Sequence, residues 1–586
     1  MSTVSSNIVA SGADLHGGQS HGPGAPDAPP SRSRFWEKGL PAIGVAVGIL
    51  LVLAPFLATV IRSLLYWQPD GAVIVTLRNF TSLLGDPRFF DAAAHTLLCG
   101  AGATAVSCVL GVSLAWIVSR TDLPGRSWFE VGNLIPFFLS PYVGAEAWRY
   151  LAAPGSGIIH KMALEFFGVR LPFLDIYGLG GVIWVLAIFY TPYVYLFVIS
   201  PLRRMDAALE DAARVHGASF ICAIRHITLP LLMPALLSAA MIVFVTSAGL
   251  FDVPFALAAP HGIRTVPTEI YSSLQYPSDF GRAAAFGMLV LGLTVTLTLW
   301  QRHYLASRRF ETVSGKSYRP RIIQLSPGGR IAALTLELAY IGVGVALPII
   351  ALLMVSLQSI WTGQFRSGFA TLQNFRYVLV SYDLTRTAIF NSLVLAVAGA
   401  SIGVSLGALQ SYFLNRSTSR ARGLIEAILS LPIGISGIIL GLGFLILAVR
   451  TPLYSTLWII LIAYVAHFFP LAVRTVAAML VAINPELEQS ARASGATWWQ
   501  TMRYVLLPLL KPALVAAWLM LFVIFVRELG SAILLYGQGT ETISVALVAL
   551  GDRNFGFVAA LAVVQLVLLL SAFALFRLTR VSLVQD

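Results

Sequence analysis

Six ionisable side chains stand inside or at the ends of long apolar stretches of this chain. Inserting such a residue into a bilayer costs roughly 2.5–3.5 kcal/mol, so ionisable residues at membrane depth usually pair with one another or line a path for substrate or ions. They are therefore candidates for a pathway or a gate. The six residues are Glu146, Arg149, Asp252, His467, Arg527 and Glu528.

The spacing of these residues predicts different surroundings for them. Glu146 and Arg149 are three residues apart, which places them on one helical face and predicts a mutual ion pair near the outer surface. Asp252 ends an apolar stretch and is expected at the outer mouth of a helical bundle, facing either substrate or water. Arg527 and Glu528 are neighbours in sequence, so their side chains point in different directions and need separate partners.

Other chemistry has little support in the sequence. The tripeptide 315–317, Gly-Lys-Ser, imitates the end of a phosphate-binding loop, but Phe310 stands where the first glycine is required. The three cysteines lack the spacing of a zinc site or a disulfide framework. No nucleophile motif and no paired-carboxylate pattern is apparent. We therefore expect no ATPase site, no metal site and no bound cofactor in this chain, and we do not expect it to be an enzyme.

Two polar stretches about 278 residues apart repeat one pattern, and each precedes a long apolar run. Residues 210–230 read EDAARVHGASFICAIRHITLP, and residues 488–508 read EQSARASGATWWQTMRYVLLP. Such an internal repeat indicates two homologous halves. Each copy predicts a helix, a break at a glycine that tolerates the turn, and a second short helix. Aligned without a gap, the copies share Glu210 with Glu488, Ala213 with Ala491, Gly217 with Gly495, Leu229 with Leu507 and Pro230 with Pro508.

The composition is typical of a polytopic membrane protein. Hydrophobic residues make up 57% of the chain, charged residues make up 11%, and the mean hydropathy is +0.80. A helix needs about 20 apolar residues to cross a bilayer. The sequence therefore predicts an all-α membrane protein with about 12 transmembrane helices, six in each half. The expected spans are approximately 40–64, 95–118, 131–152, 178–200, 230–251, 282–301, 332–357, 390–414, 424–448, 454–477, 511–533 and 556–577.

The chain divides into four predicted segments. Residues 1–35 are rich in Ser, Gly, Pro and His and predict a disordered cytoplasmic tail. Residues 36–301 form the first repeat and 331–586 the second, and a basic cytoplasmic link at 302–330 joins them.

The offset between the two repeats changes along the chain. TLRNF at 76–80 returns as TLQNF at 371–375, whereas Pro192 is matched by Pro470. The offset falls by about 18 residues between these matches. The first repeat therefore carries an insertion near 150–177, on the side away from the polar stretches.

The distribution of Lys and Arg predicts the orientation in the membrane. With the amino terminus inside, the tail, the even-numbered connections and the carboxyl tail hold about 25 of the 39 basic residues. Both polar stretches and both termini are then cytoplasmic. The net charge of +12 reflects this topology and attraction to anionic membrane lipid, and we expect no nucleic-acid partner.

The two polar stretches resemble the cytoplasmic loop of the membrane subunits of ATP-binding-cassette (ABC) importers. In that family an acid, two alanines, a glycine and a Leu-Pro pair mark the coupling helix that docks onto the ATPase. Glu210 and Glu488, one residue earlier, offer a second candidate for the carboxylate. The first copy matches at Asp211, Ala212, Ala213, Gly217, Ile227, Leu229 and Pro230, and the second at Gln489, Ser490, Ala491, Gly495, Val505, Leu507 and Pro508.

This resemblance implies partners that supply the energy. Two cytoplasmic ATPase subunits, one for each coupling loop, would bind ATP and Mg²⁺ and hydrolyse the nucleotide. The two fused halves of this chain would supply what is often a dimer of membrane subunits.

Across nearly all of residues 40–580 the chain resembles the fused, double-length permeases of the ferric-iron uptake type. RTDLPGR at 120–126, GAEAW at 144–148 and TVSGKSYRPR at 312–321 carry this resemblance. It implies the fold of a type I ABC importer permease in a bacterial inner membrane. It also implies alternating access to a substrate, ferric iron, that a periplasmic binding protein delivers.

The residues themselves leave the substrate open. The sequence shows no cluster of Tyr, His or carboxylates suited to ferric coordination, and similar permeases serve aminoethylphosphonate, thiamine or polyamines. A secondary transporter driven by an ion gradient is an alternative of a different class. Such a transporter is expected to place broken helices and ionisable groups near the membrane midplane, rather than two matched cytoplasmic loops.

Overall fold

The computed structural model describes residues 39–68, 70–172, 174–205, 212–213, 215–306, 322–363, 367–417, 420–551 and 554–578. The predicted tail at 1–35, the middle of the link at 302–330, and Glu210 and Asp211 of the first coupling loop lie outside these residues. Within the described residues, ten helices are long and apolar enough to cross a membrane, or eleven if one bent pair counts as a span. The all-α membrane fold is therefore confirmed.

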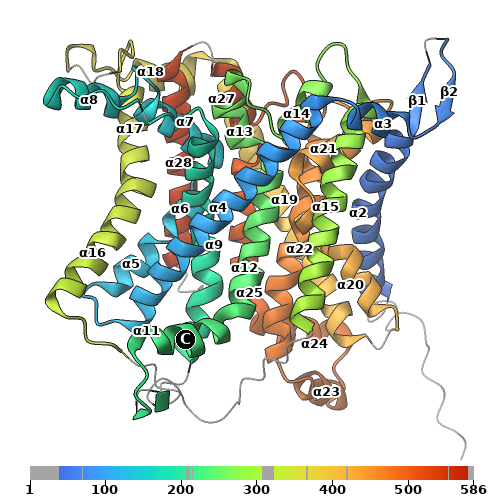
Figure 1. Cartoon of the computed structure of the whole chain (residues 1–586). Helices are drawn as coiled ribbons and strands as arrows, with labels where there is room; N and C mark the ends of the chain where they lie inside the picture. The colour runs from blue at the N-terminus through green and yellow to red at the C-terminus, as the bar shows by residue number, and fades with distance from the viewer. Residues whose placement is uncertain are drawn as a thin grey trace, which may run out of the picture.

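The first half consists of helices and one small hairpin (Figure 1). The hairpin strands β1 (Leu65–Trp67) and β2 (Val73–Val75) are antiparallel, with Leu65 opposite Val75. The helices are α2 (Leu40–Leu64), α3 (Arg78–Leu84), α4 (Pro87–Arg120), α5 (Arg126–Gly132), α6 (Ile135–Phe138), α7 (Pro141–Ala152), α8 (Ile158–Phe167), α9 (Leu179–Arg204), α11 (Phe220–Ala223), η2 (Ile224–Thr228), α12 (Leu229–Gly249), α13 (Asp252–Leu257), η3 (Ala259–His261), α14 (Val266–Ser273) and α15 (Phe280–Ala306).

The second half repeats this order. Its helices are α16 (Pro327–Ile341), η4 (Gly342–Ala346), α17 (Leu347–Ser356), η5 (Ser367–Phe369), α18 (Gln373–Arg376), η6 (Tyr377–Ser381), α19 (Asp383–Arg416), α20 (Arg422–Ser430), η7 (Leu431–Gly434), α21 (Gly437–Ala448), α22 (Leu457–Ala482), α23 (Glu486–Ala493), α24 (Trp498–Thr501), η8 (Met502–Leu506), α25 (Leu507–Arg527), α26 (Ala532–Leu535), α27 (Ile543–Leu550) and α28 (Phe555–Leu578).

Matched helices agree in length and in their contacts. Helices α4 and α19 both have 34 residues, α9 and α22 both have 26, and α12 and α25 both have 21. The side-chain amide of Asn79 donates to the Ser63 carbonyl at 2.9 Å, and Asn374 donates to the Ser356 carbonyl at 2.8 Å. The TLRNF and TLQNF motifs therefore fix the same corner in each half, because each asparagine satisfies a carbonyl at the end of the preceding span.

The predicted insertion lies where the offset changes. Residues 153–178 join α7 to α9, whereas residues 449–456 join α21 to α22. The longer connection carries α8. Figure 1 places α8 at the end of the bundle opposite α11, α23 and α24, so both the position and the side of the insertion are confirmed.

The third span of each half is broken, which departs from the predicted continuous spans. Residues 131–152 fall in three short helices, α5, α6 and α7, because Pro136 and Pro141 begin new helices and cannot donate a backbone hydrogen bond. In the second half, α20 with η7 meets α21 at 105°, and Pro432 lies at that break. The broken segments account for the difference between about 12 expected spans and the ten or eleven observed.

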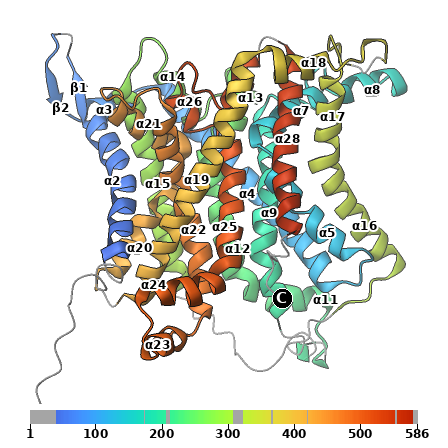
Figure 2. The ribbon, with the colours of Figure 1, turned by 180° about the vertical axis from the view of Figure 1, so that it is seen from behind.

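The first span of each half packs against the other half. Helix α2 lies beside α20 and α21, and α16 with α17 lies beside α5 and α7 (Figures 1 and 2). Gln410 Nε2 of α19 donates to the Gly44 carbonyl of α2 at 3.0 Å. Tyr340 of α16 donates to the Ile188 carbonyl of α9 at 3.1 Å. The two halves are thus interlocked around one continuous apolar core.

Candidate functional site

The two coupling loops lie at the same end of the bundle, where Figure 1 shows α11, α23 and α24. Each loop turns at its shared glycine. Gly217 has φ +85° and Gly495 has φ +87°, a left-handed conformation that glycine adopts without steric cost. The predicted break is therefore present in both copies. An added Cβ would meet nothing within 4 Å at either position, so both turns face open space.

The second coupling loop has the predicted helix, break and short helix. Helix α23 is followed by the turn at Gly495 and by α24, whose first turn is capped by Thr497. The Thr497 hydroxyl accepts from the Gln500 amide at 3.3 Å, and Gln500 Oε1 accepts from the Thr497 amide at 2.8 Å. This reciprocal capping box fixes the direction in which α24 leaves the turn.

The acidic position of the second loop is resolved by burial. Glu488 is 8% exposed, and its Oε1 accepts from Arg416 Nε of α19 at 2.7 Å. The Tyr412 hydroxyl donates to Glu488 Oε2 at 3.4 Å, and Trp498 Nε1 of α24 donates to the Tyr412 hydroxyl at 3.2 Å. Glu488 therefore holds the loop to its own bundle, whereas Gln489 is exposed.

The remaining coupling residues lie on the surface or just below it. The Leu-Pro pairs begin α12 and α25, and each follows one π-helical turn, η2 or η8. Glu210 and Asp211 lie outside the described residues, and Arg120, the residue equivalent to Arg416, is buried at the end of α4. The exposed members are Ala212, Gly217, Leu229, Pro230, Gln489, Ser490, Gly495, Leu507 and Pro508, and the partly buried members are Ala213, Ile227, Ala491 and Val505.

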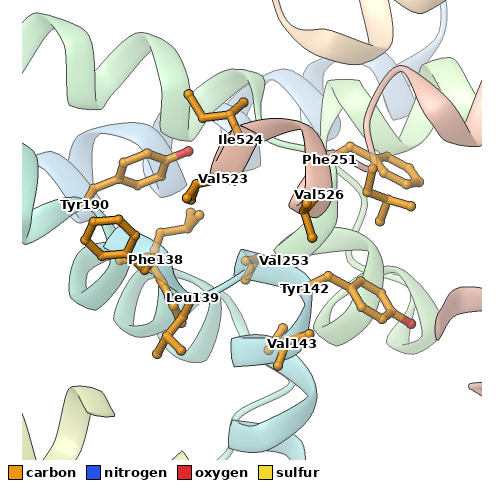
Figure 3. Close-up of a cluster of buried hydrophobic side chains, with 14 of the residues drawn as sticks. Phe138, Leu139, Tyr142, Val143, Tyr190, Phe251, Val253, Val523, Ile524 and Val526 are labelled. Carbon is orange, nitrogen blue, oxygen red and sulfur yellow. The ribbon is translucent and has the colours of Figure 1, made fainter. Parts of the chain in front are cut away.

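A central cavity lies between the two halves. It encloses about 1180 Å³ of empty space, part of it open to solvent, and α9, α12 and α13 line one side while α21, α22 and α25 line the other. Figure 3 shows the apolar packing beside it, in which Phe138 and Leu139 of the first half lie near Val523 and Ile524 of α25. Asp252, Arg527, Glu528 and His467 all line the cavity, although they come from separate elements.

Arg527 and Glu528 have separate partners, as predicted. Arg527 Nη1 donates across the interface between the halves to the Phe137 and Leu139 carbonyls, the second at 3.1 Å. Its guanidinium also lies 5.0 Å from the centre of the Phe137 ring, within range of a cation–π interaction. Glu528 Oε1 accepts from the Ser531 amide and hydroxyl, both at 3.2 Å.

Asp252 and His467 are the other ionisable groups of the cavity. His467 Nε2 lies 3.0 Å from the Ile435 carbonyl. Asp252 is 4% exposed, and its carboxylate has no hydrogen bond or ion pair to another residue that the structure describes. Of the two predicted environments for Asp252, the cavity is therefore the one observed, and open water is not.

Glu146 and Arg149 form the predicted ion pair away from the cavity. Arg149 Nη2 lies 2.6 Å from Glu146 Oε2, and Glu146 is 1% exposed. The Arg149 guanidinium lies 5.1 Å from the centre of the Phe555 ring of α28, and Tyr150 donates to the Phe555 carbonyl at 3.4 Å. The pair thus joins α7 to α28, which favours a structural role.

One buried carboxylate was missed by the sequence analysis. Glu337 of α16 is fully buried, and its Oε2 accepts from Asn133 Nδ2 of the first half at 2.9 Å. The signal was present, because Glu337 stands inside the expected span 332–357 and meets the same criterion as the other six residues. Within the described residues, no group of three His, Cys, Asp or Glu side chains is placed to hold a metal ion.

Comparison with known proteins gives a family and several relatives. The family model described as binding-protein-dependent transport system inner membrane component matches residues 107–310 and 399–580. A putative ferric transport system permease protein of Haemophilus influenzae is 25% identical over 466 residues, covering 77% of this chain and 71% of its own. A putative 2-aminoethylphosphonate transport system permease protein of Salmonella paratyphi A is 31% identical over 242 residues, covering 41% and 90%.

Among solved structures, a chain of a bacterial alginate ABC transporter in complex with a periplasmic protein is similar. The likeness covers 48% of this chain and 97% of that chain, with 18% identity and a TM-score of 0.40, which is too remote to bear on substrate.

Proposed function

Because the chain belongs to the family of binding-protein-dependent transport system inner membrane components, we propose that it is the membrane permease of an ATP-driven importer of ferric iron. It is a multi-pass protein of the inner membrane. The observation that carries the proposal is the pair of matched coupling loops, each turned by a left-handed glycine, at one end of an interlocked pair of halves.

The coupling loops are proposed as docking points for two cytoplasmic ATPase subunits. These subunits bind ATP and Mg²⁺ and hydrolyse the nucleotide, and this chain contributes no nucleotide site of its own. Both termini and both loops then face the cytoplasm, as the distribution of Lys and Arg favours. A periplasmic binding protein delivers the substrate to the opposite end of the bundle.

The central cavity is the proposed path. It lies between the halves, and the side chains from both halves that line it include Asp252, Arg527 and Glu528. Closure of the ATPases on ATP moves the coupling loops, and the ties between loop and bundle, such as Glu488 to Arg416, carry this motion to the spans. The halves then rock around the cavity and expose it to each side of the membrane in turn.

Ferric iron is proposed over the alternative substrates because of how much of the chain the relatives match. The ferric permease of Haemophilus influenzae aligns with 77% of this chain, a share that spans both halves. The aminoethylphosphonate permease aligns with 41%, about one half. Aminoethylphosphonate is therefore the second substrate to test.

The test is ATP hydrolysis stimulated by the binding protein, with substrate uptake, in proteoliposomes that contain this chain and its ATPase. We expect a Gly217→Trp, Gly495→Trp double variant to lose both activities together, because a bulky side chain at these left-handed turns blocks docking. Gly168→Trp is the matched control, since Gly168 also has a positive φ and open space but ends α8 at the other end of the bundle. Uptake that persists without any bound ATPase would refute the proposal and favour a gradient-driven transporter.

A further inference from the structure

The central cavity has matched positions in the two halves but unmatched chemistry. The same offset of 278 residues that relates α12 to α25 also relates the residues at their outer ends. At each of three matched positions, one half has a charged residue and the other has an uncharged one. The matched pairs are Gly249 with Arg527, Leu250 with Glu528, and Asp252 with Gly530.

This asymmetry separates folding from function. All six of these residues line the cavity, so each charged side chain has an uncharged counterpart in the same fold. Leu250 shows that the helix end does not require the Glu528 carboxylate, and Gly530 shows that the following turn does not require the Asp252 carboxylate. The charges are therefore present for a reason other than building the two halves.

The Asp252 carboxylate lacks a protein partner. It is 4% exposed, it lines the cavity, and no hydrogen bond or ion pair joins it to another described residue. A buried carboxylate normally has a partner, because an unpaired charge in a low-dielectric site is strongly unfavourable. The charges that act on it are those of Glu528 and Arg527, so the two carboxylates share one electrostatic environment.

The remaining charges of the cavity leave room for a cation. The Arg527 guanidinium donates to two backbone carbonyls, and its single positive charge offsets only one of the two carboxylates. Glu528 Oε1 is held by Ser531. Tyr190, from α9, adds an aromatic ring and a hydroxyl to the same lining.

We propose that Asp252 and Glu528, one from each half, form a cation subsite in the central cavity that the imported substrate occupies in transit. This inference rests on the proposed function of the chain as an importer permease. Two cationic groups suit such a site: a hard trivalent metal ion, which prefers carboxylate oxygen, and the ammonium group of a small organic zwitterion. Arg527 keeps the binding weak, as transit requires, because a substrate must leave the site as readily as it enters.

The experiment measures trivalent cation binding to the purified full-length chain in lipid nanodiscs. Terbium(III) is the probe, since nearby tyrosine rings such as Tyr190 sensitise its luminescence. We expect Asp252→Asn and Glu528→Gln each to weaken the saturable signal by about tenfold or more, because each removes one charged ligand. Asp383→Asn, at a side chain that is 92% exposed on α19, should leave terbium binding unchanged.

Two further variants guard against misfolding. Asp252→Gly and Glu528→Leu introduce the residues that the other half already has at these positions, and they should weaken terbium binding to the same extent. Unchanged terbium affinity in all four variants, or an equal loss in Asp383→Asn, would overturn the proposal.

Competition identifies the source of the cation. Displacement of terbium by ferric citrate, with citrate alone as the blank, supports a metal-ion substrate. Displacement by aminoethylphosphonate supports its ammonium group. Binding-protein-stimulated ATPase activity is measured on the same variants: its absence in the wild type would refute the importer assignment, whereas its presence with unchanged terbium affinity would refute only the cation subsite.

Discussion

Arg416 at the end of α19 and Glu488 in α23 form an ion pair that fastens the second coupling loop to the membrane-spanning bundle. Nε of Arg416 lies 2.7 Å from Oε1 of Glu488, and Nη2 donates to the Ile483 carbonyl at 3.2 Å. The pair is largely buried, with 18% and 11% of the two side chains exposed. Movement of α23 is therefore passed directly to α19.

Reversing this ion pair tests its role in coupling. We expect Arg416→Glu and Glu488→Arg each to lower substrate uptake per ATP hydrolysed, and the double variant to recover part of it, because the opposite charges are restored in reversed order. Contacting pairs of this kind typically show interaction energies of about 0.5–3 kcal/mol. The measurement is uptake and ATP hydrolysis in the same proteoliposomes.

The control for this prediction is the neighbouring residue. Gln489 is exposed, so Gln489→Arg should not be rescued by Arg416→Glu. If both double variants recover equally, the pair acts through net charge rather than through contact, and the latch is wrong.

The repeat and its turns were predictable because they depend on local residue types. Gly217 and Gly495 had to occupy a conformation that other residues resist, and the spacing of Glu146 and Arg149 was sufficient to predict their ion pair. Hydrophobic runs also marked nearly every span. They failed at 131–152, where Pro136 and Pro141 interrupt an otherwise apolar stretch.

The cavity and the interlocking of the halves could not be predicted from these patterns. Hydrophobicity indicates that α2 and α16 are buried or in lipid, but not which half they contact. Asp252 and Glu528 are separated by most of the second half in sequence, and only the packing of α12 against the other half brings them to one cavity. The sequence analysis therefore found their types and missed their association.

A second ion pair predicts a dependence on pH. Asp122, after α4, accepts from the Leu325 amide at 3.0 Å and from Arg330 Nη2 at 2.7 Å. The Leu325 amide, and after it Arg330, hold the pKa of Asp122 below its usual value. The stabilisation is therefore fully present above the ordinary aspartate pKa of about 3.9 and is lost as the pH falls through the lowered folded-state value.

We expect Asp122→Asn to lower the thermal unfolding temperature at pH 7, and the difference from wild type to shrink as the pH falls below about 4. The effect should be small because both side chains are partly exposed. Thermal unfolding of the two purified proteins across this pH range provides the measurement. A difference that stays constant with pH would show that the carboxylate charge is not responsible.

Arg527 is expected to stabilise the contact between the halves. Replacing it with methionine, which has a similar length, leaves the Phe137 and Leu139 carbonyls without their donor, at a cost of about 1–3 kcal/mol for an unsatisfied buried group. Arg527→Met should therefore lower the thermal unfolding temperature, whereas Arg386→Met, at an exposed pair, should not. Equal unfolding temperatures would show that Arg527 serves the cavity alone.

The two matched asparagines test whether the halves unfold together. Asn79 and Asn374 each satisfy backbone carbonyls at the end of a span, so each alanine substitution should cost about 1–3 kcal/mol. Because the asparagines lie in separate corners with no shared partner, their costs should add within about 0.5 kcal/mol if the chain unfolds in one step.

The interlocked packing of α2 and α16 is the reason to expect one step, since neither half keeps its own first span. Denaturant unfolding of Asn79→Ala, Asn374→Ala and the double variant, followed by tryptophan fluorescence, measures this. A single transition with additive shifts in midpoint is the expected result. Two separate transitions, each moved by only one of the substitutions, would mean that the halves are independent folding units despite their exchanged helices.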